Sequence, residues 1–268
     1  MQNHRNCYKN VWILSGTSDG PVIANRLLEL NFSVFVSVLT YKAGQAYIKN
    51  PKLHIITGKL NNKDEIINFI KKNQIKYVVD ATHAFASIIS KNLNNACKEI
   101  NTPLLIFERK SQINTTNNFI YIDDLKNINK NDLGNKNILL AIGSRFLDDT
   151  AKYYINCKAN VFARVLPTYE SITKAFGSCI KTSNIAILEP SKNNESILEK
   201  KLCDFWEIDY VLCRESGSYS QKNWERIVAG SKMKLFLVKR PKVKNDYFYS
   251  FNQYQNLINH IIKTNIDF

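Results

Sequence analysis

Short apolar runs alternate with longer amphipathic stretches along most of this 268-residue chain. Runs rich in β-branched and aromatic residues predict strands, whereas apolar residues that recur every three or four positions predict helices. The predicted strands of the first half are residues 11–15, 33–39, 53–57, 77–80 and 104–107. Helices are predicted between them, with clear apolar faces at residues 62–73 and 85–100. Such regular alternation is typical of a parallel sheet covered by helices on both faces.

The same alternation returns in the second half, after a polar interval at residues 111–136 that is rich in Asn, Thr, Lys and Ser. The further predicted strands are residues 138–142, 160–164, 185–188, 210–213 and 235–238, and the further predicted helices are residues 169–176, 196–205, 223–229 and 254–262. We therefore predict an α/β protein with two doubly wound parallel-sheet lobes and a cleft between them. The expected division is residues 1–112, a linker with one short strand at 113–136, and residues 137–268.

The first predicted strand runs into the sequence SGTSDG, which has the features of a phosphate-binding loop. Gly16 allows a tight turn and a close approach to the backbone. Thr17 and Ser18 add hydroxyl groups beside a predicted helix N-terminus, which attracts anions. Because ligands of open α/β sheets bind outside the carboxyl ends of the strands, this loop is a candidate binding site. An ordinary strand-to-helix turn is the alternative interpretation.

The second predicted strand ends at Thr40-Tyr41-Lys42, without a carboxylate. In nucleotide-binding sheets a carboxylate at this point binds the ribose of NAD, whereas an uncharged or basic site accommodates the extra phosphate of NADP. If a dinucleotide binds, the sequence therefore favours NADP. The alternative is that Lys42 is one more exposed lysine.

The fourth predicted strand ends at Asp80, with Thr82 and His83 directly after it. A histidine gains or loses a proton near neutral pH, so His83 on a strand-end loop is a candidate catalytic residue. Asp80 would lie at the same edge of the sheet. The alternative is a structural or solvent-exposed histidine.

The second half offers an arginine near the end of three predicted strands, and arginine binds carboxylates through paired hydrogen bonds. The sequence Gly143-Ser144-Arg145 also has the composition of an anion-binding turn. Three arginines directed at one cleft would indicate an acidic ligand. They are Arg145, Arg164 and Arg214.

The chain is basic, with 37 Lys and Arg against 23 Asp and Glu and a formal net charge of +14. Such a surface suits an anionic partner. The sequence shows no long basic run and no helix-turn-helix or zinc-finger spacing, so we expect a small anionic molecule rather than nucleic acid. The 6 Cys are irregularly spaced and accompany only 4 His, which argues against a zinc site or a disulfide framework. Without a recognisable signal peptide or membrane span, we expect a cytoplasmic protein.

In chain order, the strand-end motifs SGTSDG, SVLT, DATHAFA, FER, GSR, RVLP, RESG and KRP resemble the precorrin-6A reductase and cobalt-precorrin-6A reductase family of vitamin B12 synthesis. The resemblance extends over residues 11–241. It implies two Rossmann-like lobes with the active site between them, and reduction of a ring double bond by NADPH. It also implies a tetrapyrrole substrate with many carboxylates, which gives the arginines a purpose.

Both lobes then contribute to the expected site. Catalytic roles are expected for His83 and Asp80, with His83 as the proton donor and water as the alternative. Contacts with NADPH are expected at Gly16, Thr17, Ser18, Ser37, Thr40, Lys42, Thr82, Gly143, Ser144 and Arg145. Contacts with the substrate are expected at Arg164, Arg214, Ser216 and Gly217.

Two other functions remain open from the sequence. One is a different two-lobed tetrapyrrole enzyme that needs no dinucleotide, such as a lyase like uroporphyrinogen-III synthase. The other is a non-catalytic sensor of a dinucleotide or an anion. Binding of NADPH separates the first of these from a reductase, and turnover separates the second.

Overall fold

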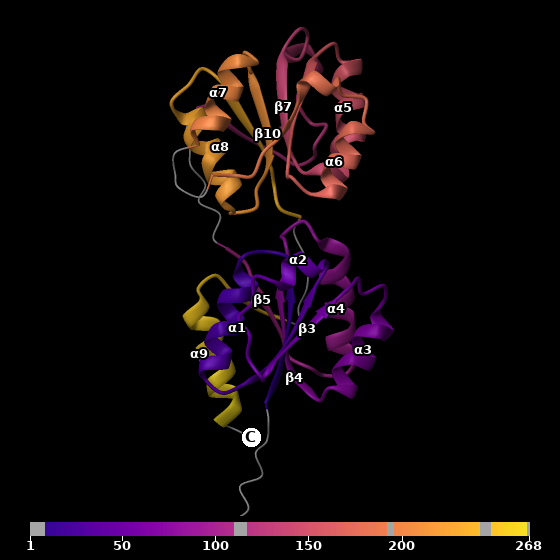
Figure 1. Cartoon of the computed structure of the whole chain (residues 1–268), viewed down its shortest axis with the longest axis vertical. Helices are drawn as coiled ribbons and strands as arrows, with labels where there is room; N and C mark the ends of the chain where they lie inside the picture. The colour runs from indigo at the N-terminus through magenta and orange to yellow at the C-terminus, as the bar shows by residue number, and fades with distance from the viewer. Residues whose placement is uncertain (1–8, 110–116, 192–195, 242–247, 267–268) are drawn as a thin grey trace, which may run out of the picture. The chain divides into compact units, whose positions relative to one another are not determined.

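The computed structural model describes residues 9–109, 117–191, 196–241 and 248–266 (Figure 1). The chain divides into two compact units. Unit 1 comprises Met1–Lys110 and Pro241–Phe268, and unit 2 comprises Ser111–Arg240. Each unit has its own sheet and its own core.

The sheet of unit 1 has six strands in the order β12-β5-β4-β1-β2-β3, and every strand pairing within it is parallel. The strands are β1 (Asn10–Ser15), β2 (Ser33–Val38), β3 (Leu53–Thr57), β4 (Ile75–Ala81), β5 (Leu104–Phe107) and β12 (Phe248–Phe251). The chain builds outward from β1 in one direction and then continues from β4 in the other. The crevice beyond the ends of β1 and β4 is therefore the topological switch point, where open α/β sheets bind ligands.

Helices cover both faces of this sheet, which explains why its central strands read as continuous apolar runs. Figure 1 shows α1 (Asp19–Glu29) and α9 (Tyr254–Ile266) on one face, and α3 (Lys63–Lys72) and α4 (Ser87–Glu99) on the other. Val11 and Ile13 pack toward α1 and α9, whereas Trp12 packs on the opposite face with the isoleucines of α3. The short helix α2 (Tyr41–Gly44) follows β2.

The sheet of unit 2 repeats this arrangement in the order β6-β11-β10-β7-β8-β9, again with parallel pairings. Its strands are β6 (Phe119–Ile122), β7 (Asn137–Ala141), β8 (Asn160–Val165), β9 (Ile185–Ile187), β10 (Tyr210–Arg214) and β11 (Lys234–Val238). The α-helices are α5 (Leu147–Asn156), α6 (Tyr169–Phe176), α7 (Ile197–Phe205) and α8 (Tyr219–Ala229), and short 3-10 turns lie at Lys130–Asp132, Ser144–Phe146 and Thr182–Asn184. Figure 1 shows α5 and α6 on one face and α7 and α8 on the other. The switch point of this unit lies beyond the ends of β7 and β10.

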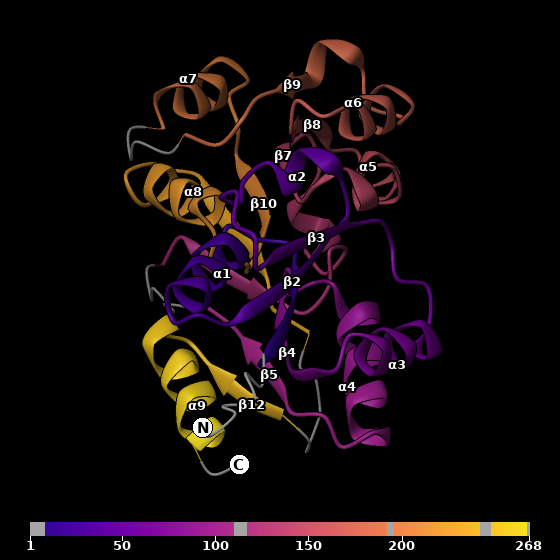
Figure 2. The same ribbon diagram turned by 60° about the horizontal axis from the view of Figure 1, so that its bottom comes forward.

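The predicted α/β class with two doubly wound parallel sheets is confirmed, but the expected boundaries differ from the observed units. Residues 137–268 do not all belong to unit 2, because β12 pairs with β5 and α9 packs on unit 1 (Figure 2). Leu257 and Ile261 of α9 are fully buried in the core of unit 1. The short strand predicted within residues 113–136 is β6, and it pairs with β11 at the edge of the sheet of unit 2, so it belongs to that unit. The cleft between the lobes stays a prediction.

Among the residues that the structure describes, none of the helices is both long enough and apolar enough to cross a membrane.

Candidate functional site

Two loops of unit 1 meet at its switch point. The amide of Gly16, after β1, donates a 3.3 Å hydrogen bond to the carbonyl of Ala81 at the end of β4. A β-carbon placed on Gly16 would lie only 3.2 Å from the backbone nitrogen of His83 and 3.4 Å from the α-carbon of Thr82. A side chain at position 16 would therefore push the two loops apart. The structure thus brings together two sets of predicted residues, from the loop after β1 and the loop after β4.

Asp80, near the end of β4, fixes the loop that follows this strand through hydrogen bonds. It is 3% exposed, and its Oδ1 accepts hydrogen bonds from the amide of Thr82 at 3.0 Å and from the hydroxyl of Thr82 at 2.6 Å. Its Oδ2 accepts a 2.6 Å hydrogen bond from Ser90 in α4. Both oxygens are therefore engaged inside the protein. This geometry suits a residue that fixes the turn toward His83, whereas a catalytic role was expected for Asp80.

His83 is half-buried on the turn between β4 and α4. Its Nδ1 accepts a 3.2 Å hydrogen bond from the backbone amide of Phe85. Because an amide only donates, this contact requires an unprotonated Nδ1 and places the proton of the neutral ring on Nε2. In this state His83 can donate a hydrogen bond but is a poor source of a proton.

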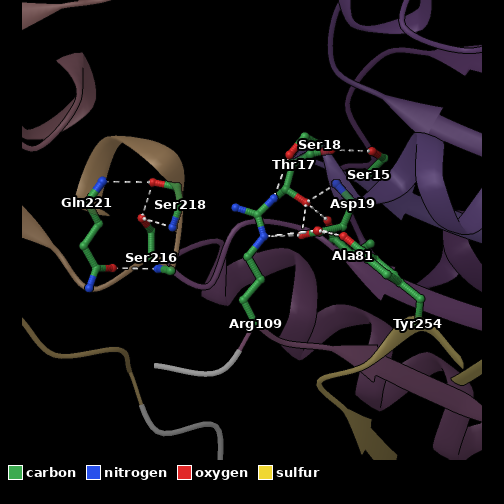
Figure 3. Close-up of polar contacts among 11 residues, drawn as sticks. Ser15, Thr17, Ser18, Asp19, Ala81, Arg109, Ser216, Ser218, Gln221 and Tyr254 are labelled. Carbon is green, nitrogen blue, oxygen red and sulfur yellow. Dashed lines mark hydrogen bonds and ion pairs between the residues drawn. The ribbon is translucent and has the colours of Figure 1, made fainter. Parts of the chain in front are cut away.

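The loop after β1 is held by residues from distant parts of unit 1 (Figure 3). Asp19, the first residue of α1, is 3% exposed, and the Nε of Arg109 lies 2.9 Å from its Oδ2. The hydroxyl of Tyr254, at the start of α9, donates a 2.6 Å hydrogen bond to Oδ1 of Asp19. Burial, together with this bond and the charge of Asp19, raises the pKa of Tyr254 to about 12. Nη2 of Arg109 also donates to the hydroxyl of Ser18 at 2.7 Å.

Asp19, Arg109 and Tyr254 were not among the site residues expected from the sequence. A local signal existed for Arg109, which follows the end of β5 by two residues. For Tyr254 the sequence holds no such signal, because the contact depends on the return of the chain to unit 1.

The predicted residues at the end of β2 occupy three different environments. Ser37 is buried and accepts a 2.9 Å hydrogen bond from the indole of Trp12, so its hydroxyl serves the core. Thr40 caps α2 by accepting a 3.2 Å hydrogen bond from the amide of Ala43. Lys42 is exposed on α2.

The switch point of unit 2 brings together a second set of predicted residues. Gly143, after β7, has a φ of +84°, which favours glycine. A β-carbon there would lie 3.1 Å from Nη2 of Arg214, so the guanidinium of Arg214 packs over the turn. Burial lowers the pKa of Arg214, and the positive charge of the exposed Arg145 lowers it further. The two neighbouring positive charges make this crevice attractive to an anion.

The turn after β10 is fixed by residues of α8, as Figure 3 shows. Gly217 has a φ of +66°, and its amide donates a 2.6 Å hydrogen bond to Oε1 of Gln221. Gln221 in turn donates from Nε2 to Glu225 at 2.6 Å. The hydroxyls of Ser216 and Ser218 lie 2.7 Å apart. Gln221 and Glu225 did not stand out in the sequence, because a Gln and a Glu four residues apart are ordinary on a helix surface.

Arg164 is separated from the other two arginines. Successive side chains of a strand point to opposite faces, and Phe162 of β8 packs on the face that α7 and α8 cover. Arg164 shares that face, is 7% exposed, and has buried Nε and Nη2 atoms without a hydrogen-bond partner. Burial lowers the pKa of Arg164, against the opposing charge of the buried Glu199. Of the three arginines expected to share one crevice, Arg164 therefore lies on the opposite face of the sheet from Arg214.

Within the part of the chain that the structure describes, no group of three or more His, Cys, Asp or Glu side chains is arranged to hold a metal ion.

A family model and individual relatives, compared with this chain over most of its length, indicate the same family. A family model described as Precorrin-6x reductase CbiJ/CobK matches residues 10–261. The cobalt-precorrin-6A reductase of Methanocaldococcus jannaschii is 30% identical over 273 residues, which cover 96% of this chain and 100% of that protein. The cobalt-precorrin-6A reductase of a Synechocystis strain is 29% identical over 212 residues, which cover 78% of this chain and 79% of that protein.

One solved structure has a closely similar fold. A structure described as CobK precorrin-6A reductase aligns with a TM-score of 0.76 and covers 95% of this chain and 97% of its own. Its sequence identity to this chain is 16%, so this likeness concerns the fold alone.

Proposed function

Because the chain belongs to the precorrin-6x reductase family, we propose that it reduces a ring double bond of precorrin-6A or cobalt-precorrin-6A with NADPH, in the biosynthesis of cobalamin. Membership of a reductase family implies a reductant and a precorrin substrate. The choice of NADPH, the residues that bind it and the residues that bind the substrate are our proposals, and each has support in the geometry of one unit.

NADPH fits the switch point of unit 1. The single observation that carries this assignment is the close contact between the loops after β1 and β4, where Gly16 leaves room for the backbone of His83. Ser18 is exposed, does not cap α1, and lies at the helix N-terminus, where phosphates bind. The end of β2 carries Lys42 and no acid, which suits the 2′-phosphate of NADP. We therefore assign Gly16, Thr17 and Ser18 to the phosphates, and Thr40 and Lys42 to the adenosine side.

When bound, NADPH supplies a hydride to one carbon of the ring double bond, and a proton completes the reduction at the other. We place His83 beside the reacting atoms, with Thr82 next to it and Asp80 holding their turn. Because Nδ1 of His83 accepts from Phe85, the ring presents its proton from Nε2 as a hydrogen-bond donor. We therefore favour water over His83 as the final source of the proton.

The substrate carries carboxylates, and unit 2 offers cations for them. We assign Arg214, Ser216 and Gly217 to substrate binding at the switch point of that unit. Arg145, which was expected from the sequence to contact NADPH, is assigned to the substrate here because its charge acts on Arg214. Arg164 stays a proposed contact with a substrate carboxylate, on the opposite face of the sheet of unit 2. Its buried Nε and Nη2 have no hydrogen-bond partner among the described residues, although the charge of Glu199 acts on it. Gly143 and Ser144 fix the turn that presents Arg145.

The direct test measures oxidation of NADPH with purified protein under anaerobic conditions, with precorrin-6A and cobalt-precorrin-6A as separate substrates and a small carbonyl compound as the control. Turnover is expected with at least one corrinoid and not with the control. Tight binding of NADPH without turnover of either corrinoid would instead indicate a sensor.

Exchange of Arg214 for Ala provides a second test. The KM for the corrinoid should rise and should lose part of its dependence on ionic strength, because salt screens the attraction between the arginine and a carboxylate. A KM that is the same in the wild type and the variant at low salt would remove Arg214 from the proposed site.

A further inference from the structure

One buried carboxylate at the start of α1 is held by residues from two other segments of unit 1. Asp19 accepts from Nε of Arg109, which follows β5, and from the hydroxyl of Tyr254, which begins α9. Residues 109 and 254 are separated from residue 19 by 90 and 235 positions. Figure 3 shows both side chains pointing at Asp19 from different directions. Their common target lies directly after the loop that we assign to the phosphates of NADPH.

Tyr254 is itself firmly placed. Its ring stacks on that of Phe107 in β5, with centroids 4.6 Å apart and planes inclined by 8°. The guanidinium of Arg26 lies over the ring of Tyr254, 5.3 Å from its centroid. The hydroxyl therefore reaches Asp19 from a ring whose position does not depend on that hydrogen bond.

The same group of residues determines what Ser18 offers to a ligand. The oxygen of Ser18 accepts from Nη2 of Arg109 at 2.7 Å, and Ser18 makes no capping bond to α1. A hydroxyl that accepts a hydrogen bond from a cation is polarised and becomes a stronger donor through its own hydrogen. Thr17 differs, because its hydroxyl lies 2.9 Å from Oδ2 of Asp19 and accepts from the amide of Asp19 at 3.2 Å. Of the two hydroxyls, Ser18 is therefore the one suited to donate to an anion.

We propose that Asp19, Arg109 and Tyr254 form a clasp that holds the loop after β1 in its binding conformation and directs the hydroxyl of Ser18 at a phosphate of NADPH. Arg109 and Tyr254 act as positioning residues through Asp19 and Ser18. The inference rests on the proposed function, since it concerns the affinity of the same cofactor loop. It also assigns a role to the C-terminal segment, which returns from unit 2 to complete the clasp.

The test replaces Tyr254 with Phe, which removes the hydroxyl and retains the ring on Phe107. The matched control is Tyr249→Phe, in the same C-terminal segment, because Tyr249 is 55% exposed and its ring contacts His260 instead of Asp19. For Tyr254→Phe we expect the Kd and the KM for NADPH to rise by about tenfold, the size of effect of one hydrogen bond to a charged group. The kcat should stay within about twofold of the wild type. Tyr249→Phe should leave all three unchanged.

Amide hydrogen exchange of the peptide that spans residues 16–20 supplies a readout that needs no cofactor. Exchange should be faster in Tyr254→Phe than in Tyr249→Phe, because the clasp no longer orders the loop. Equal exchange and equal Kd in the two variants would overturn the proposal while leaving the reductase function intact. If the wild-type protein did not bind NADPH, the cofactor assignment would fail instead, and the exchange comparison would still decide whether the clasp orders the loop.

Ser18→Ala tests the last link separately, because Ser18 is exposed and its removal leaves the three clasp residues in place. We expect NADPH to bind about tenfold more weakly to this variant, with exchange at residues 16–20 close to that of the wild type. Unchanged binding of NADPH would show that Ser18 does not donate to it.

Discussion

Gly20 in the first turn of α1 is the position where a single added methyl group should damage unit 1 most. A β-carbon there would lie 2.1 Å from Oγ of Ser15, 2.7 Å from the β-carbon of Ser15 and 2.4 Å from the hydroxyl of Tyr47. Rotation of the Ser15 side chain removes only the first of these overlaps. The second requires a shift of the helix or of the strand end, since a β-carbon is fixed to the backbone.

Two effects of Gly20→Ala oppose each other. Alanine stabilises a helix by about 1 kcal/mol relative to glycine. Overpacking of a close-packed site costs about 1–3 kcal/mol, and here the overlap involves three atoms from two side chains. Because three atoms overlap, the cost should lie in the upper part of that range, about 2–3 kcal/mol, so the free energy of unfolding should fall by about 1–2 kcal/mol. The affinity for NADPH should fall as well, because α1 begins at the cofactor loop.

Urea denaturation of the wild type, Gly20→Ala and a matched control measures this effect. The control is Gly134→Ala, where a β-carbon meets nothing within 4 Å and φ is not positive. It should be neutral or stabilising by up to about 1 kcal/mol. Ser15→Gly removes two of the three overlapping atoms, so the double variant should recover part of the loss, and a double-mutant cycle should give a coupling of at least about 0.5 kcal/mol. If Gly20→Ala were as stable as Gly134→Ala, the close packing of α1 against β1 would be refuted.

Two further predictions concern buried carboxylates. Asp80→Ala should lower the free energy of unfolding, measured in urea, by about 2–3 kcal/mol, because it leaves the donors of Thr82 and Ser90 without their acceptor. Asp80→Asn can still accept from Thr82 and should cost less. Equal losses in the two variants would contradict this account. Burial raises the pKa of Glu225 above its ordinary 4.5, so the folded state holds this proton more tightly than the unfolded state. The stability of the wild type should therefore fall as pH rises from about 4.5 through the raised pKa. Glu225→Gln should reduce that fall, and its side-chain oxygen can still accept from Gln221. Urea titrations at a series of pH values measure the difference.

The sequence predicted well what depends on neighbouring residues. The apolar run of β1 and the isoleucine face of α3 follow from local periodicity, and the structure shows both elements within a few residues of their predicted bounds. The loops that contain Gly16 and Gly143 were predicted as strand ends for the same reason. That the loop with Gly16 would meet the loop after Asp80 followed from the switch-point rule for parallel sheets.

The sequence predicted poorly what depends on contacts between distant segments. β12 is only four residues long, and nothing in its sequence FYSF indicates which of two similar sheets it joins. The faces of Arg164 and Arg214 could be read only after the bounds of β8 and β10 were known, because one residue of register reverses every side chain. Likewise, the side chains of Ser37 and Asp80 form hydrogen bonds inside the protein. Composition and position in the sequence do not show whether a polar side chain at a strand end bonds within the protein or faces a ligand.

These two kinds of information meet at the cofactor loop. The composition of this loop is visible in the local sequence, but the residues that hold it come from after β5 and from the start of α9. Since a loop of small residues has little intrinsic preference for one conformation, its order must come from contacts such as those of Asp19 with Arg109 and Tyr254. Substitutions in the C-terminal segment should therefore affect binding at the N-terminal loop, although no sequence motif connects the two.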